Sequence, residues 1–140
     1  MMLTDVCNEL DIPRPEVKIV PGKLLGTKLA ACSSDGKELL LRRDLKIYEL
    51  AMAISHECRH IWQYKTGKHS PPSAVDDYAD SAANLKEYSR QECEIDANAY
   101  AQYICMQQLG ITLDFGKLPQ GVKDEINRRA KEFLLNGCEV

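Results

Sequence analysis

The chain has 140 residues, of which 44% are hydrophobic and 28% are charged, an ordinary composition for a globular protein. We therefore expect residues 1–140 to form one domain with a hydrophobic core of its own. The net charge of −3 leaves no basic excess to neutralise phosphates, so the sequence argues against a dedicated nucleic-acid-binding protein.

Six cysteines are spread along the chain, and no two of them form a CxxC pair. A chain long enough to bury a core needs no disulfide framework, so we expect reduced cysteines that are mostly buried as small apolar residues. Residues 1–11 lack the apolar run of a signal peptide, and no segment has the length of a membrane span. These features predict a cytoplasmic protein that makes no use of a membrane.

The first part of the chain predicts a short helix and a small sheet. Residues 1–10 have the pattern of an amphipathic helix. Three short apolar segments then alternate with turn residues, at 17–20, 26–32 and 38–41. Their hairpin spacing predicts a small antiparallel sheet of about three strands.

Helical patterns fill most of the rest. Residues 45–65 are helical in pattern, and Asp44 stands at the expected N-cap position. A polar loop with two prolines follows at 66–74. Further helices are expected at about 85–109, where Gly110 ends the pattern, and from 120 or 122 to 135. Because strands come first and helices afterwards, the predicted class is α+β.

The segment His56-Glu57-Cys58-Arg59-His60 has the HExxH form. Residues four apart on a helix differ by about 40° around its axis, so both imidazoles project from one face and can bind one zinc ion. Glu57 is offset by about 60° from the nearer imidazole when the helix is viewed along its axis. It can therefore reach a metal-bound water without binding the metal, as a general base must.

The rest of that helix supports a site on its polar side. Its apolar residues fall on the half of the helix opposite His56: Ile47, Leu50, Ala51, Ile54, Cys58 and Ile61. We expect Trp62 in the core as well, and Arg59 at the surface. Cys58 lies about 200° from His56, which argues against a structural zinc site with cysteine ligands.

Zinc needs a third protein ligand, and several polar side chains are candidates: His69, Glu87, Glu92, Glu94 and Asp96. The glutamates of the helix at 85–109 are favoured, because an antiparallel return after the loop would bring that helix beside the first. Glu92 and Glu94 differ by about 200°, so only one of them can face the metal. The small residues Ala101 and Cys105 share the side of Glu94 and allow a close approach, which favours Glu94.

Two segments resemble the gluzincin metallopeptidases, in particular the small ImmA/IrrE-like and phage-type metallopeptidases. They are the HExxH segment and the run 94–101, which is similar to the family's Glu-x-x-Ala-(Asp/Asn)-x-(Phe/Tyr)-Ala helix. The resemblance covers roughly residues 37–105. It implies a minimal zincin-like fold, with the sheet packed on the HExxH helix and on a second ligand-bearing helix. It also selects Glu94 as the third ligand, and it implies a peptide bound as an extra strand along the sheet edge.

The same resemblance assigns Asn98 the place where many gluzincins have an aspartate that orients a zinc-bound histidine. The chain carries no recognisable helix-turn-helix module, so the regulatory role of some relatives is not implied.

The predicted function is that of a zinc-dependent metallopeptidase acting on a peptide or protein substrate. Bound Zn²⁺ activates water, and Glu57 accepts the proton as general base. The residue that stabilises the oxyanion stays open among Tyr64, His69, Tyr78, Tyr88 and Tyr100. The alternative is a zincin-fold regulatory or binding protein with little proteolytic activity, which the presence of Glu57 disfavours. The sequence predicts no oligomeric state.

Overall fold

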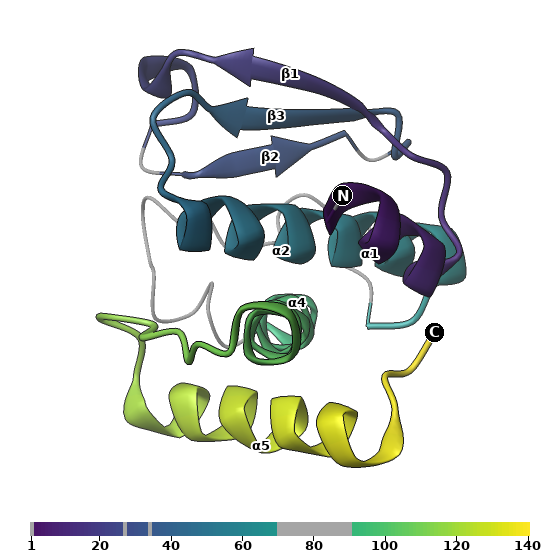
Figure 1. Cartoon of the computed structure of the whole chain (residues 1–140), viewed down its shortest axis with the longest axis vertical. Helices are drawn as coiled ribbons and strands as arrows, with labels where there is room; N and C mark the ends of the chain where they lie inside the picture. The colour runs from purple at the N-terminus through teal and green to yellow at the C-terminus, as the bar shows by residue number, and fades with distance from the viewer. Residues whose placement is uncertain (1, 27, 34, 70–90) are drawn as a thin grey trace.

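The computed structural model describes residues 2–26, 28–33, 35–69 and 91–140. Its elements, in chain order, are α1 (Met2–Leu10), β1 (Glu16–Val20), η1 (Gly22–Leu24), β2 (Ala30–Cys32), β3 (Glu38–Arg42), α2 (Ile47–Thr66), α4 (Glu92–Ile104), η3 (Cys105–Leu109) and α5 (Gln120–Asn136). Figure 1 shows them in layers, with the sheet above α1 and α2, α4 below α2, and α5 at the base. The class is α+β, as the sequence predicts.

The sheet is mixed, so the expectation of an antiparallel sheet is wrong in one respect. Its strand order is β1-β3-β2, with β2 antiparallel to β3 but β1 parallel to it. Strands β2 and β3 form a hairpin, and Gly36 between them has a positive φ of 75°. The chain between β1 and β2 contains the helical turn η1 and is no hairpin. It places β1 beside β3, parallel to it, instead of beside β2.

The N-cap of helix α2 lies two residues later than predicted. Lys46, and not Asp44, is the N-cap residue, and its backbone N–H donates to the Glu49 carboxylate over 3.0 Å. This reciprocal bond satisfies one of the free amides at the helix start, a role that the side chain of Asp44 was expected to fill. The helix ends at Gly67, whose φ of 75° is left-handed.

The apolar side of α2 packs into the core as expected, with two exceptions. Ile54, Cys58 and Trp62 are buried among residues of α1, the sheet and α4. Ile47 is 77% exposed, because it is the first residue of the helix and projects past the core. Arg59 was expected at the surface, yet its exposed fraction is 0%.

Helix α4 crosses α2 instead of lying antiparallel beside it. Figure 1 shows α4 nearly end-on, whereas α2 runs across the view. The crossing is close because small residues meet there: Ala51 of α2 packs with Ala101 and Cys105. The helical path continues through η3 and stops at Gly110, as predicted. The helix begins at Glu92 and not near residue 85, because Gln91 before it is an extended N-cap residue. Most of the loop predicted at 66–74 lies outside the described residues.

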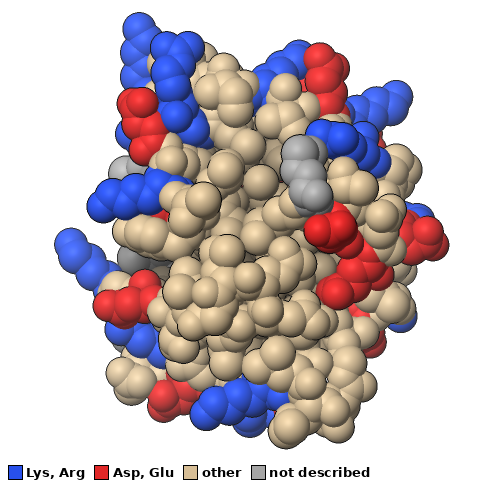
Figure 2. Space-filling model, viewed as in Figure 1, with Lys and Arg blue, Asp and Glu red and all other residues tan. Residues whose placement is uncertain are grey.

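Charged side chains of both signs surround the face shown in Figure 2, and its centre is uncharged. All six cysteines are free, and four of them are buried, in line with the expectation. In the described part of the chain, no helix combines the length and the apolarity needed to cross a membrane.

Candidate metal centre

Three potential ligands meet where α4 crosses α2. His56 and His60 project from α2, one turn apart, and Glu94 projects from the first turn of α4. The Nε2 atoms of the two imidazoles are 3.0 Å apart. One carboxylate oxygen of Glu94 lies 3.3 Å from Nε2 of His56, and the other lies 2.9 Å from Nε2 of His60.

These separations fit a single small cation. Ligand atoms placed tetrahedrally at 2.0–2.2 Å from zinc are about 3.3 Å from one another. The observed separations of 2.9–3.3 Å differ from this value by only a few tenths of an ångström. Within the described ranges, these three side chains are the group of His, Cys, Asp and Glu whose ligand atoms converge in this way. They could hold a metal ion.

Burial and charge favour a cation at this point. His60 is 6% exposed and Glu94 only 2%. Burial lowers the pKa of His60, but the Glu94 carboxylate outweighs that effect and raises it to about 9. Burial would raise the pKa of Glu94, yet His56 and His60 hold it well below its usual range. A buried carboxylate that stays ionised is stabilised by positive charge beside it, which a metal ion can supply in place of a proton.

Each imidazole also has a partner for its second nitrogen. Nδ1 of His56 donates to Oδ1 of Asn98 on α4 over 2.8 Å. Nδ1 of His60 donates to Oε1 of Gln63, also over 2.8 Å. Asn98 thus lies where the resemblance implies. Gln63 was missed by the sequence reasoning, although a polar residue three positions after His60 lies on the same side of the helix.

Glu57 lies beside the ligand group without belonging to it. The carboxylate is half-buried and approaches β2, where it faces the thiol of Cys32. Burial, and then the negative charge of Glu57, raise the pKa of that thiol. Its charge acts on His60 as well as on Cys32, so the carboxylate lies near both the ligand group and the edge strand.

Glu92, the alternative to Glu94 as third ligand, pairs with residues away from the centre. Glu92 is half exposed and forms ion pairs with Arg129, at 2.6 Å, and with His69, at 2.7 Å. The second nitrogen of His69 meets Glu139 at 2.8 Å. Both ring nitrogens of His69 are thus committed to carboxylates, and neither faces the centre. Glu87 lies outside the described residues.

Asp96, another of the candidate ligands, is also paired away from the centre. It is 2% exposed and forms two bonds with the buried guanidinium of Arg59, at 2.8 and 3.1 Å. A buried carboxylate and a buried guanidinium satisfy each other, which explains why both leave the surface.

The structure distinguishes some of the candidates for stabilising the oxyanion. Tyr100 is buried and its hydroxyl donates to Glu9 over 2.8 Å. Tyr64 is partly exposed and follows His60 by one helical turn. Burial, more than any neighbouring charge, raises the pKa of Tyr64 and keeps its phenol protonated. Tyr78 and Tyr88 lie outside the described residues.

Comparison with known proteins assigns no family. No protein-family model matches the chain, and no solved structure matches it. A biosynthetic arginine decarboxylase from Shewanella denitrificans is 23% identical over 144 aligned positions. The alignment covers 95% of this chain but only 23% of the decarboxylase. Identity at this level, over less than a quarter of the longer protein, does not place the chain in that protein's family.

Proposed function

We propose that the protein is a zinc-dependent metallopeptidase of the gluzincin type, with His56, His60 and Glu94 as the zinc ligands. The observation that carries the proposal is the convergence of these three side chains to within 3.3 Å of one another. Three protein ligands leave one position for water or substrate, which is the arrangement of catalytic zinc sites. Two neutral imidazoles and a carboxylate suit zinc better than magnesium or calcium, which prefer oxygen ligands.

The residues around the ligand group match the needs of peptide hydrolysis. When bound, zinc supplies a Lewis acid for the scissile carbonyl and lowers the pKa of a water molecule. Glu57 takes the proton from the attacking water and delivers it to the leaving amine. Asn98 orients His56 for binding through Nε2. Each of these groups has a separate task, and only Glu57 handles the proton.

The sheet offers a place for the substrate backbone. Strand β2 is at the edge of the three-stranded order β1-β3-β2, and it packs beside α2. In the described residues its second edge has no strand partner, so an extended peptide can pair with it by backbone hydrogen bonds. Cys32 at the end of β2 faces Glu57, so a peptide on this edge would pass the catalytic base.

The test is a comparison of two zinc-loaded proteins on a mixture of unstructured peptides. Glu57→Gln removes the base but is nearly isosteric, so zinc content and folding should match the native protein while hydrolysis is lost. Products would be identified by mass spectrometry, and a chelator would serve as the blank. Equal hydrolysis by both proteins would contradict the role of Glu57. Zinc binding without hydrolysis in the native protein would favour the regulatory alternative.

A further inference from the structure

We propose that Gln63 is a positioning residue for the zinc ligand His60: it holds the imidazole proton on Nδ1 and thereby leaves Nε2 as the nitrogen that binds metal. This inference rests on the proposed function, because it concerns a ligand of the same centre. Gln63 is fully buried and lies three residues after His60 on α2. Its Oε1 accepts from Nδ1 of His60, while Nε2 of the same ring faces Glu94.

The orientation of the Gln63 amide is fixed by two acceptors. Its Nε2 donates to the backbone carbonyl of Cys93 over 2.9 Å and to Oδ2 of Asp96 over 2.8 Å. Both acceptors need hydrogens, so the NH₂ group must face them. A flipped amide would set its oxygen against a carbonyl oxygen and a carboxylate oxygen. The Oε1 atom is therefore obliged to face His60, and it can only accept.

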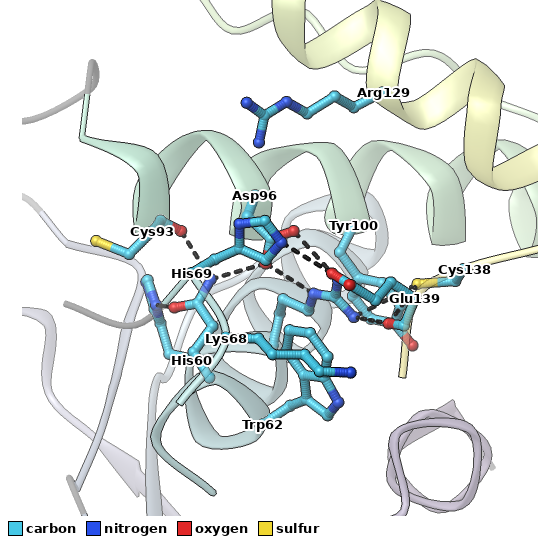
Figure 3. Close-up of polar contacts among 12 residues, drawn as sticks. His60, Trp62, Lys68, His69, Cys93, Asp96, Tyr100, Arg129, Cys138 and Glu139 are labelled. Carbon is cyan, nitrogen blue, oxygen red and sulfur yellow. Dashed lines mark hydrogen bonds and ion pairs between the residues drawn. The ribbon is translucent and has the colours of Figure 1, made fainter. Parts of the chain in front are cut away.

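Asp96, which accepts from the Gln63 amide, is itself held by further contacts. Asp96 receives two bonds from Arg59, and the guanidinium lies 3.6 Å from the centre of the Trp62 ring. Arg59 also donates to the backbone carbonyl of Glu139, over 2.6 Å. Figure 3 shows this chain of contacts running from His60 past Asp96 to Glu139 and Cys138 near the C-terminus. A network whose buried members are all paired resists reorientation of any one of them.

The two histidines are thus oriented in different ways. His56 is held across the helix crossing by Asn98 of α4, which is half-buried. His60 is held by Gln63 of its own helix. Helix α4 contributes indirectly, because Cys93 and Asp96 accept hydrogen bonds from the Gln63 amide. An oxygen that accepts the Nδ1–H bond in this way fixes the ring and its tautomer and makes the metal-binding nitrogen more basic. Loss of such a partner costs about 10- to 100-fold in metal affinity.

Gln63→Met tests this role, because it keeps the length of the side chain and removes the amide. Gln102→Met is the matched control: Gln102 is equally buried and its amide bonds Leu113 and Asn127, away from the metal centre. Zinc affinity would be measured by competition with a chromophoric chelator. We expect Gln63→Met to lose about 10- to 100-fold in affinity and Gln102→Met to retain native affinity.

Long-range ¹⁵N–¹H NMR of the zinc-loaded native protein tests the tautomer directly and needs no variant. We expect His60 to be protonated at Nδ1 and bound to zinc through Nε2. Binding through Nδ1, or native affinity in Gln63→Met, would overturn the role of Gln63 alone. A native protein that binds no zinc would instead overturn the proposed function, and this role with it. If Gln63→Met does not fold, the NMR result on the native protein decides the matter.

Discussion

Arg59 of the HExxH segment and Asp96 of α4 form a buried ion pair where the two helices cross. Removing this pair tests how much it stabilises the protein around the metal centre. The guanidinium is 0% exposed and binds both carboxylate oxygens, at 2.8 and 3.1 Å. Arg59→Leu would leave Asp96 as a buried charge whose remaining side-chain donor, among the described residues, is the Gln63 amide. Removing one partner of a buried pair costs about 3–5 kcal/mol.

That cost corresponds to a large change in thermal stability. A chain of this length has an unfolding entropy near 0.3 kcal/mol/K, so we expect the melting temperature to fall by about 10–17 °C. The assay is calorimetry in the presence of a chelator, so that zinc binding contributes nothing to the difference. Arg128→Ala is the control, since its ion pairs with Glu125 and Glu132 are exposed and should contribute little to stability.

A double variant separates the energy of the ion pair from the contributions of its two residues. Arg59→Leu with Asp96→Leu leaves no unpaired charge, so it should destabilise the protein by clearly less than the sum of the two single variants. If Arg59→Leu changed stability no more than Arg128→Ala does, the burial and pairing of Arg59 would be refuted.

Three further predictions concern the metal centre. The pKa of His60 is raised from 6.5 to about 9 in the metal-free protein, so the charged ring adds stability below pH 6.5 that is lost as pH rises through 9. Zinc must displace this proton, so its apparent affinity should fall about tenfold per pH unit as the pH drops below 9. Calorimetry should show about one proton released per zinc bound. A zinc affinity that does not change with pH would contradict this. Asn98→Ala should weaken zinc binding about 10- to 100-fold and Asn98→Asp should restore it, as chelator competition would show; equal affinity in Asn98→Ala and the native protein would exclude the orienting role. Glu94→Ala should lose zinc in elemental analysis while Glu92→Ala retains it, and the reverse result would mean that the other face of α4 binds the metal.

The parts of the site that sequence reasoning reached depend on local helix geometry. The angle between positions i and i+4 sets His56 and His60 side by side, and the angle between i and i+2 separates Glu94 from Glu92. These relations hold within one helix, whatever the rest of the chain does. The small residues of α4 further predicted a close approach of the two helices, and Ala101 does pack against Ala51.

The parts of the site that sequence reasoning missed depend on contacts between segments that are distant in the chain. Arg59 and Asp96 are 37 positions apart, and neither residue's spacing signals that the other will be buried beside it. The orientation of the Gln63 amide depends in turn on that pair and on the backbone of Cys93. The parallel pairing of β1 was missed for a similar reason, since hairpin spacing indicates only neighbouring strands. Crossing helices and crossover strands are decided by the packing of the whole core.

The central claim is that one zinc ion is bound by His56, His60 and Glu94, and anomalous diffraction at the zinc absorption edge tests it most directly. Crystals of the zinc-loaded protein should show a single strong peak at the crossing of α2 and α4. The peak should lie about 2.0–2.2 Å from Nε2 of each histidine and from a carboxylate oxygen of Glu94. A peak held by cysteine sulfur or by His69 and Glu92, or the absence of a peak at the crossing, would contradict the account.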